Sequence, residues 1–289
     1  MNRIPDFSYL NPLVECEQKW YYKFIEEWDP KEESVLLKAG RAGHGALAEW
    51  YHPRSMYSRE CALDALHVLY EGTVPRGKYE YLTFGHLETI VKNYHDYWLG
   101  KCPWDVVQRI EDPIIAKIDG VEFGGIPDLM VEEHGELLVV DHKFTTSYLG
   151  GHLYNRVKFQ HQLRKYCLLA SEEYDTPVRA GAINAIYMGD KASNSDSKAM
   201  RFDRYRFDFT EEQLEETEIW LLELNRRATE HRRYTVTDDD EFPQHGGSHC
   251  GWCEYRPLCE ASPPLRDGIK NASFKKREVT GLLRSGADS

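Results

Sequence analysis

Residues 124–146, with the sequence GGIPDLMVEEHGELLVVDHKFTT, constrain the fold of this chain more than any other stretch. The stretch contains two short apolar runs separated by His134-Gly135, and apolar runs bounded by turn residues predict two buried strands joined by a turn. Asp128 lies in the first run, and Asp141 directly follows the second, at residues 137–140. We therefore expect two carboxylates at the ends of neighbouring strands, where both can point at one spot.

This arrangement of carboxylates suits a hard divalent cation, which takes oxygen ligands. Lys143 is expected on the same strand face as Asp141, because side chains along a strand repeat every second residue. A metal ion with an open coordination position, and a cation beside it, are what phosphodiester hydrolysis requires. In the plainer interpretation, Asp-x-Lys at a strand end has no catalytic role, and Asp128 with its neighbouring Gly and Pro only forms a turn.

Two predicted helices carry further candidates. The stretch from about 155 to 173 lacks Gly and Pro and has apolar residues at helical spacing,. Gln162 and Tyr166 are four residues apart there, so they share a helix face and can reach together toward a phosphate or base. His44 lies on a helix predicted to open near Ser34, and a neutral imidazole is a metal ligand. Taken alone, each of these residues also fits an ordinary structural role.

Three cysteines near the C-terminus, Cys250, Cys253 and Cys259, form a C-x2-C-x5-C motif, which brings two thiolates within reach of one metal centre,. A fourth ligand is needed, and Cys16 is the natural candidate. The chain has seven cysteines, an odd number, and no signal peptide precedes it, so we expect metal ligation in a reducing compartment rather than disulfides,.

Other residues leave the identity of that metal open. His245 and His249 lie close to the motif in sequence, so a zinc site stays possible,. The remaining cysteines are expected to be small buried residues; they are Cys61, Cys102 and Cys167.

The order of these elements resembles the RecB-type branch of the PD-(D/E)XK nucleases. It is more closely similar to the iron–sulfur exonucleases that include the CRISPR-associated member and the nuclease domain of AddB. The resemblance spans about residues 8–260. It rests on Cys16, His44, Asp128, Asp141-x-Lys143, Gln162-x3-Tyr166, Cys250, Cys253 and Cys259 in that order.

The resemblance implies a role for each of these residues. His44, Asp128 and Asp141 would bind Mg2+ or Mn2+, Lys143 would be the catalytic lysine, and Gln162 with Tyr166 would form the helix motif beside the active site. The four cysteines would hold a [4Fe–4S] cluster; they are Cys16, Cys250, Cys253 and Cys259. Glu111 matches an acidic position often found in such nucleases.

The chain departs from the family pattern at two positions. Asp141 stands where many relatives have Glu, a longer carboxylate ligand, and Glu17 follows Cys16 where the family often has proline. No family motif is recognisable between His44 and Glu111.

Composition is compatible with a globular enzyme but not obviously with DNA binding. The chain has 289 residues, of which 41% are hydrophobic, enough to bury a full core,. No run approaches the 18 or so apolar residues of a membrane span. The net charge of −12 opposes phosphate binding, which is largely electrostatic,. Basic clusters could line a DNA path, although such clusters are usually solvated faces; they are Lys38 with Arg41, then Arg156, Lys158, Arg164 and Lys165, and then Arg226, Arg227, Arg232 and Arg233.

We therefore predict an α/β fold with a PD-(D/E)XK nuclease core, in which helices flank a mixed central sheet. A single domain would span residues 1–264, with an α-rich region at 1–105, the core at 106–235 and a cluster loop at 236–264 paired with Cys16. Residues 265–289 would form a loose, basic and polar tail. Helices are expected at 14–28, 34–51, 58–71, 83–99, 155–173 and 210–233, and strands at 113–119, 121–131, 136–142, 179–188 and 201–209.

The resemblance implies a metal-dependent exonuclease that hydrolyses phosphodiester bonds of single-stranded DNA, with a structural iron–sulfur cluster. Two other classes stay open. One is a DNA-trimming or adaptor subunit of a CRISPR integration or recombination complex, active only with integrase or recombination partners. The other is a zinc-bound nucleic-acid-binding protein, which the intact Asp128, Asp141 and Lys143 disfavour. No membrane association is expected, and the location would be cytoplasmic, or the host cytoplasm for a phage-encoded protein.

Overall fold

The computed structural model describes residues 3–278, apart from 55, 102–103, 105, 148, 159–160, 191–200 and 234–245. By its internal contacts the chain divides into two compact units. One, which we call the terminal unit, contains residues 1–33, 117–125 and 218–289. The other, the sheet unit, contains residues 34–116 and 126–217.

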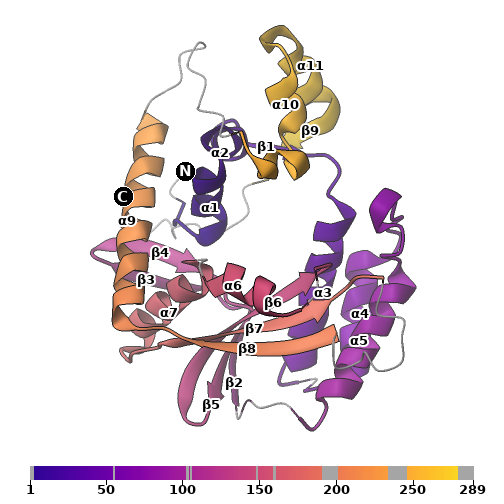
Figure 1. The fold of residues 1–289 in the computed structure, drawn as a ribbon, viewed down its shortest axis with the longest axis vertical. Helices are drawn as coiled ribbons and strands as arrows, with labels where there is room; N and C mark the ends of the chain where they lie inside the picture. Colours follow the sequence, from indigo (N-terminus) through magenta and orange to yellow (C-terminus); the bar gives the residue numbers. More distant parts are fainter. Residues whose placement is uncertain are drawn as a thin grey trace. The chain divides into compact units, whose positions relative to one another are not determined.

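A five-stranded mixed sheet organises the sheet unit (Figure 1). Its strands, in spatial order, are β2 (Val106–Ile110), β5 (Leu129–Glu133), β6 (Glu136–Thr145), β7 (Ala180–Tyr187) and β8 (Phe202–Asp208). β6 and β7 are parallel, and the other neighbouring pairs are antiparallel. β7 is buried along its whole length, as expected for a central strand covered on both faces,.

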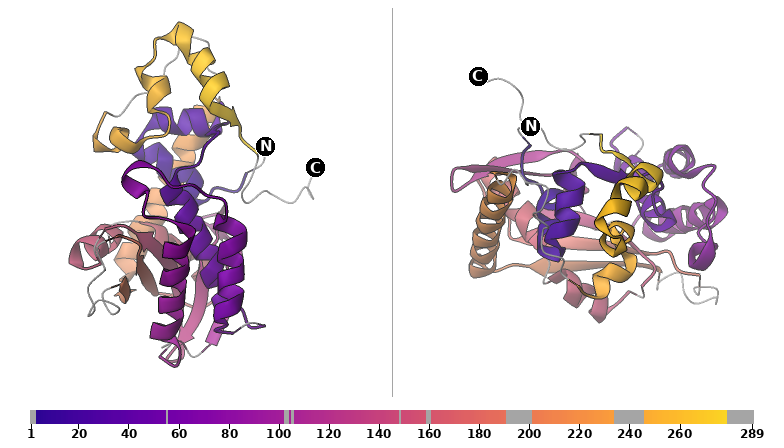
Figure 2. Two further views of the ribbon diagram at one scale, coloured as in Figure 1. Left: turned by 90° about the vertical axis from the view of Figure 1, so that its right-hand side faces the viewer. Right: turned by 90° about the horizontal axis from the view of Figure 1, so that it is seen from above.

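Three helices pack together beside this sheet, α3 (Val35–Tyr51), α4 (Arg59–Tyr70) and α5 (Phe84–Trp98) (Figure 2). Each begins at a capping hydroxyl that accepts a backbone N–H of the first turn, from Ser34, Ser58 and Thr83,. Their apolar faces share one core with the even-numbered face of β6, through buried residues such as Trp50, Leu66 and Ile90 packed with Leu138 and Val140.

Two further helices, α6 (Gly151–Lys158) and α7 (His161–Tyr174), follow β6. α7 contacts β6 and β7. Its Gln162 binds Lys143, whereas Tyr51 of α3 stacks on His142. Neighbouring residues of a strand point to opposite faces, so α3 and α7 cover opposite faces of the sheet.

The terminal unit joins both ends of the chain. β1 (Trp28–Pro30) pairs antiparallel with β9 (Phe274–Lys276), and Tyr255 donates a hydrogen bond to the carbonyl of Trp28 (2.6 Å). Tyr22, Tyr255, Leu258 and Phe274 form the core of this pairing. Further elements of this unit include α1 (Phe7–Glu15), α2 (Glu17–Phe24), η2 (Ser248–Trp252), α10 (Arg256–Glu260) and α11 (Pro263–Ser273).

The remaining elements are β3 (Ile114–Ile118) and β4 (Val121–Gly125), which form a hairpin, the short helix η1 (Gly77–Tyr79), and α9 (Glu211–Arg233). Asp119 and Gly120 both adopt positive φ at the hairpin turn, as expected for that sequence,. Thr210 and Gln213 form the predicted capping box at the start of α9,.

The predicted fold class is confirmed, since helices flank a central mixed sheet. Several local predictions are wrong. The helix expected after Cys16, within residues 14–28, is present as α2 but ends at Phe24, and α1 before it was missed. Cys16 has extended backbone (φ −167°) between the two helices. The strand expected at 121–131 is two strands, because Pro127 interrupts it, and β2 was missed,. The expected helix at 155–173 is two helices, and the loose tail after Pro264 instead begins with α11 and β9. Among the described residues, no helix is long and apolar enough to cross a membrane.

Candidate functional site

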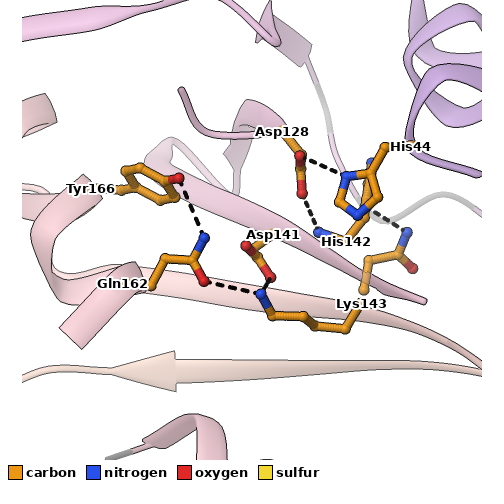
Figure 3. A network of polar contacts seen from close by, with 8 residues as sticks. His44, Asp128, Asp141, His142, Lys143, Gln162 and Tyr166 are labelled. Atoms are coloured by element: carbon orange, nitrogen blue, oxygen red, sulfur yellow. Dashed lines mark hydrogen bonds and ion pairs between the residues drawn. The ribbon is translucent and has the colours of Figure 1, made fainter. Parts of the chain in front are cut away.

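Asp128, which directly precedes β5, is held through both of its carboxylate oxygens. Its Oδ2 accepts the backbone N–H of His142 (2.5 Å), and its Oδ1 lies 2.9 Å from Nδ1 of His44 (Figure 3). Its backbone carbonyl accepts the N–H of Glu111 (3.0 Å). The pairing of β5 with β6 therefore brings Asp128 next to His142, and the pairing of β5 with β2 brings Glu111 next to Asp128.

His44, Glu111 and Asp128 form a group that could hold a metal ion. One nitrogen or oxygen atom from each residue lies within 4.8 Å of the others. His44 reaches this position because Gly43, beside it on α3, lets the helix approach β6 closely. A Cβ on Gly43 would lie 2.3 Å from the ring of Phe144. Glu111, whose role the sequence left uncertain, is thus placed beside His44 and Asp128.

Asp141 and Lys143 lie on the face of β6 that α7 covers, opposite to the side chain of His142,. Lys143 Nζ is 2.7 Å from Asp141 Oδ2 and donates to Gln162 Oε1 (3.0 Å). Gln162 in turn donates to the hydroxyl of Tyr166 (3.4 Å), so the predicted i, i+4 pair does share one face of α7 (Figure 3),. The structure thus joins four of the predicted site residues in one chain of polar contacts.

The two carboxylates differ in electrostatic environment. Burial raises the pKa of Asp141, only partly offset by Lys143, and the charge of Asp128 raises it further. Asp128 is also desolvated, but its contacts with His44 and the His142 N–H outweigh burial and lower its pKa. Burial opposes protonation of His44, yet Asp128 raises the pKa of His44 overall. Two carboxylates that affect each other's ionisation form a site of concentrated negative charge, which a divalent cation would neutralise.

The residues present therefore fit a divalent metal by their chemistry. Carboxylate oxygens and one imidazole nitrogen match Mg2+ or Mn2+, with nitrogen better accepted by Mn2+. The geometric group contains Glu111 in place of the predicted Asp141, whose carboxylate contacts Lys143 instead.

Sequence reasoning missed a buried polar row on the opposite face of the sheet. The register pairs His142 of β6 with Asn184 of β7, and Asn184 with Arg204 of β8. Asn184 Nδ2 lies 3.0 Å from His142 Nδ1, and Arg204 Nε donates to Asn184 Oδ1 (3.3 Å). Burial lowers the pKa of His142 to about 3, so its ring is neutral at physiological pH.

Aromatic residues of the helices enclose this row. Arg204 Nη2 donates to the hydroxyls of Tyr51 (2.6 Å) and Tyr94 (3.2 Å). Its guanidinium carbon lies 3.6 Å from the ring centroid of Trp98 and 4.1 Å from that of Trp104. This network fixes His142, whose N–H holds Asp128. The available sequence signal was the density of aromatics at these positions, which is not specific for an arginine site.

We expect Arg204→Ala to lower the free energy of unfolding by about 3 kcal/mol, because two tyrosine hydroxyls and the Asn184 amide each lose one hydrogen bond and two cation–π contacts vanish,. Arg204→Lys should not restore stability, since a lysine ammonium cannot reproduce the hydrogen bonds and ring stacking of the planar guanidinium group. Urea titration followed by circular dichroism measures the change. The control is Arg179→Ala, which removes an exposed ion pair with Glu211 and should cost less than about 1 kcal/mol,. Equal losses in both variants would contradict a structural role for the row.

The four cysteines of the predicted cluster all belong to the terminal unit. Burial raises the pKa of Cys259 to about 11, and the neighbouring thiols of Cys253, Cys16 and Cys250 raise it further, so these groups lie close enough to interact. Lys19, one turn after Cys16, pairs with Glu254 between the motif cysteines (3.7 Å). Residues near both chain ends therefore meet here.

The other cysteine and histidine predictions have mixed outcomes. Cys167 is buried as expected, whereas Cys61 is half-buried. None of the described cysteines forms a disulfide. Cys102 and His245 lie outside the described residues, and His249 is half-buried.

Four residues of the basic clusters are either buried or paired with acidic residues. Arg164 and Lys165 are buried, at 6% and 0% exposure. In the terminal unit, Arg226 pairs with Glu223 and Glu230, and Arg227 pairs with Glu17. The remaining members are Arg41 and Arg232, which are exposed, Lys38, which is half-buried, and Arg156, Lys158 and Arg233, whose side chains are outside the described part.

Comparisons with known proteins agree with this geometry. Residues 7–260 match the PD-(D/E)XK nuclease superfamily. Among solved structures, a candidate exonuclease from Eubacterium rectale has 14% identity and a TM-score of 0.51, covering 81% of this chain and 83% of that one. This likeness concerns the fold alone. The comparison with curated proteins finds no match.

Two other solved structures are more distant. An alkaline exonuclease from Laribacter hongkongensis has 12% identity and a TM-score of 0.30, over 66% of this chain and 90% of that one. A phage-related exonuclease from Haemophilus somnus has 11% identity and a TM-score of 0.32, over 71% and 97%. At these TM-scores neither alignment supports a conclusion. The family match over most of the chain does, and the chain belongs to the PD-(D/E)XK nuclease superfamily, a class of metal-dependent nucleases.

Proposed function

We propose that the chain is a metal-dependent exonuclease that hydrolyses phosphodiester bonds of single-stranded DNA. One observation carries this proposal. The group formed by His44, Glu111 and Asp128 could hold a metal ion, and the strand next to Asp128, β6, bears the ion pair of Asp141 and Lys143. Membership of a nuclease superfamily supports the reaction class. The similar solved structure from Eubacterium rectale, described as a candidate exonuclease, suggests the end-directed mode.

Asp128, Asp141 and His44 would hold one or two divalent cations, with Glu111 as a further oxygen ligand. A bound Mg2+ or Mn2+ would supply Lewis-acid polarisation of the phosphate and lower the pKa of a water molecule. Asp128 is pre-oriented for this role, because the His142 N–H and His44 fix both of its oxygens. Little reorganisation would then be needed when the substrate binds.

Lys143 would act on the water and on the developing negative charge. An ammonium group has three N–H donors. Two are directed at Asp141 and Gln162, which leaves one for a water molecule or a phosphate oxygen. Gln162 would position Lys143 and would itself be held by Tyr166. The ammonium charge would stabilise the pentacovalent phosphate as it forms.

We also propose that Cys16, Cys250, Cys253 and Cys259 hold a structural [4Fe–4S] cluster, which would place the chain in the iron–sulfur branch of RecB-type nucleases. This proposal is supported by the placement of all four cysteines in one compact unit, where Lys19, close to Cys16, pairs with Glu254 of the cysteine motif. Such a cluster would tie the two ends of one nuclease domain spanning residues 1–264, with the 265–289 segment outside it. A cytoplasmic location would suit the reduced thiols.

Cleavage of end-labelled and end-blocked DNA by the purified, anaerobically prepared protein tests this function. We expect release of short products from a free single-stranded end with Mn2+, none with EDTA, and little from a circular single strand. Efficient cutting of the circle would replace the exonuclease proposal with an endonuclease. Activity that appears only when integrase or recombination proteins are added would instead favour a trimming subunit.

A further inference from the structure

Two tyrosines stack beside the candidate active site, on the face of the sheet that carries Asp141 and Lys143. The rings of Tyr154 on α6 and Tyr205 on β8 have centroids 4.6 Å apart and an interplanar angle of 14°. Tyr154 is buried at 6% exposure, whereas Tyr205 is 46% exposed. Tyr205 therefore offers part of an aromatic ring to solvent on an edge strand, supported by a buried aromatic ring.

The strand register connects this stack to the catalytic candidates. Asp141 pairs with Ile183, and Ile183 pairs with Tyr205. Directly paired residues point to the same face, so Tyr205 is on the face of Asp141 two strands away, about 10 Å at the usual strand spacing. That distance corresponds to no more than about three nucleotides at the 3.4 Å rise of a stacked strand.

The stack is anchored through the hydroxyl of Tyr154. The hydroxyl of Tyr154 donates to Asp203 Oδ2 (2.6 Å), and Asp203 Oδ1 accepts the backbone N–H of Arg204 (2.9 Å). Asp203 pairs with Ala185, and Ala185 pairs with Lys143, so the anchor is in register with the proposed catalytic lysine. Phe207 supports Tyr205 from the same strand (4.8 Å between centroids).

We propose that Tyr205, backed by Tyr154, is a stacking platform for an unpaired base of the substrate strand, next to the phosphate that is cut. Stacking on an aromatic ring tolerates any base sequence, because every base has a π-face. The carboxylate of Asp203, which accepts the hydroxyl of Tyr154, disfavours a phosphate near the stack and is compatible with a base. A base can stack on Tyr205 only if it is free of its complementary strand, so the platform would select single-stranded or frayed DNA. This inference rests on the proposed function and specifies its substrate.

Binding of single-stranded DNA carrying 2-aminopurine at successive positions from one end, with Ca2+ in place of Mn2+, tests this inference. In the unmodified protein we expect fluorescence quenching at one position within about three nucleotides of the cut. Tyr205→Ala should remove that quenching and weaken binding about 10-fold, and Tyr205→Phe should retain both. Tyr154→Phe, which loses the bond to Asp203, should show intermediate quenching. An abasic site at the quenched position should make unmodified protein and Tyr205→Ala bind equally.

The matched control is Tyr174→Ala, which removes a tyrosine at the far end of α7, about 18 Å along the helix from Gln162,. The platform would be overturned if Tyr205→Ala showed the same quenching and affinity as the unmodified protein. It would also be overturned if Tyr174→Ala lost as much quenching and affinity as Tyr205→Ala. Cleavage assays on the same samples separate the two proposals. If DNA is cleaved and Tyr205→Ala changes neither quenching nor affinity, only the platform is refuted. If base stacking depends on Tyr205 but no metal supports cleavage, only the nuclease function is refuted.

Discussion

Asp141→Asn is expected to reduce DNA cleavage with Mn2+ by about 1,000-fold or more. The substitution would remove one carboxylate ligand of the metal. It would also remove the charged partner of Lys143, whose Nζ lies 2.7 Å from Asp141 Oδ2. Loss of a ligand removes several kcal/mol of transition-state stabilisation, and about 1.4 kcal/mol corresponds to a factor of ten in rate. The fold should persist, because asparagine keeps the volume of a 3% exposed side chain and removes a desolvated charge,. Single-turnover cleavage measures the effect, and thermal melting checks the fold.

Two companion variants sharpen this test. Lys143→Ala should be comparably inactive and still folded, since Lys143 is half-buried. Asp208→Asn is the matched control: it removes an aspartate that is 72% exposed in its side chain on β8 and should cleave at the normal rate. Unchanged turnover in Asp141→Asn would show that this carboxylate is not part of the active site.

Cys16→Ala has the second largest expected effect, on iron content and stability. Anaerobically purified protein should be brown and contain about four iron atoms per chain, as four thiolates around a cubane imply. Cys16→Ala should lose most of the iron, melt at a lower temperature and aggregate. The cluster would close a loop from residue 16 to residue 250, and the free energy of metal binding would contribute to folding.

Cys61→Ala is the control for this variant, because Cys61 is half-buried on α4 of the sheet unit. It should keep its iron. Colourless protein with one zinc per chain would favour a tetrahedral zinc site over the cluster. If Cys16→Ala keeps both its iron and its melting temperature, Cys16 is not the fourth ligand, and the proposed tie between the chain ends is wrong.

The sequence predicted features that depend on local periodicity. Side-chain alternation along a strand separated Asp141 and Lys143 from His142, and the i, i+4 rule aligned Gln162 with Tyr166. Hydroxyl caps located the starts of α3 and α9. These patterns arise within a few residues, so one sequence is enough to reveal them.

Features that depend on strand register could not be predicted in this way. The His142–Asn184–Arg204 row exists only because β6, β7 and β8 pair in one particular alignment, which no short stretch encodes,. The same holds for Tyr205, which reaches the Asp141 face through two strand pairings. Glu111 joins His44 and Asp128 because β2 pairs with β5, and β2 was missed altogether.

The net charge of −12 also has a partial structural explanation. Several acidic residues are engaged in ion pairs at the surface, such as Glu133, Glu136 and Asp208 around Arg206. The site itself concentrates Asp128, Asp141 and Glu111, whose charges a metal would offset. DNA binding would then depend on the metal and on base stacking more than on a basic surface.

The dependence of cleavage rate on Mn2+ concentration, measured with labelled single-stranded DNA, tests the central claim most directly. Unmodified protein should show a saturable increase from no activity in EDTA, and Asp128→Asn should need a much higher Mn2+ concentration and reach a much lower maximum. Cleavage that is independent of metal, or that saturates at the same Mn2+ concentration and rate in Asp128→Asn, would contradict a metal-dependent nuclease site at Asp128.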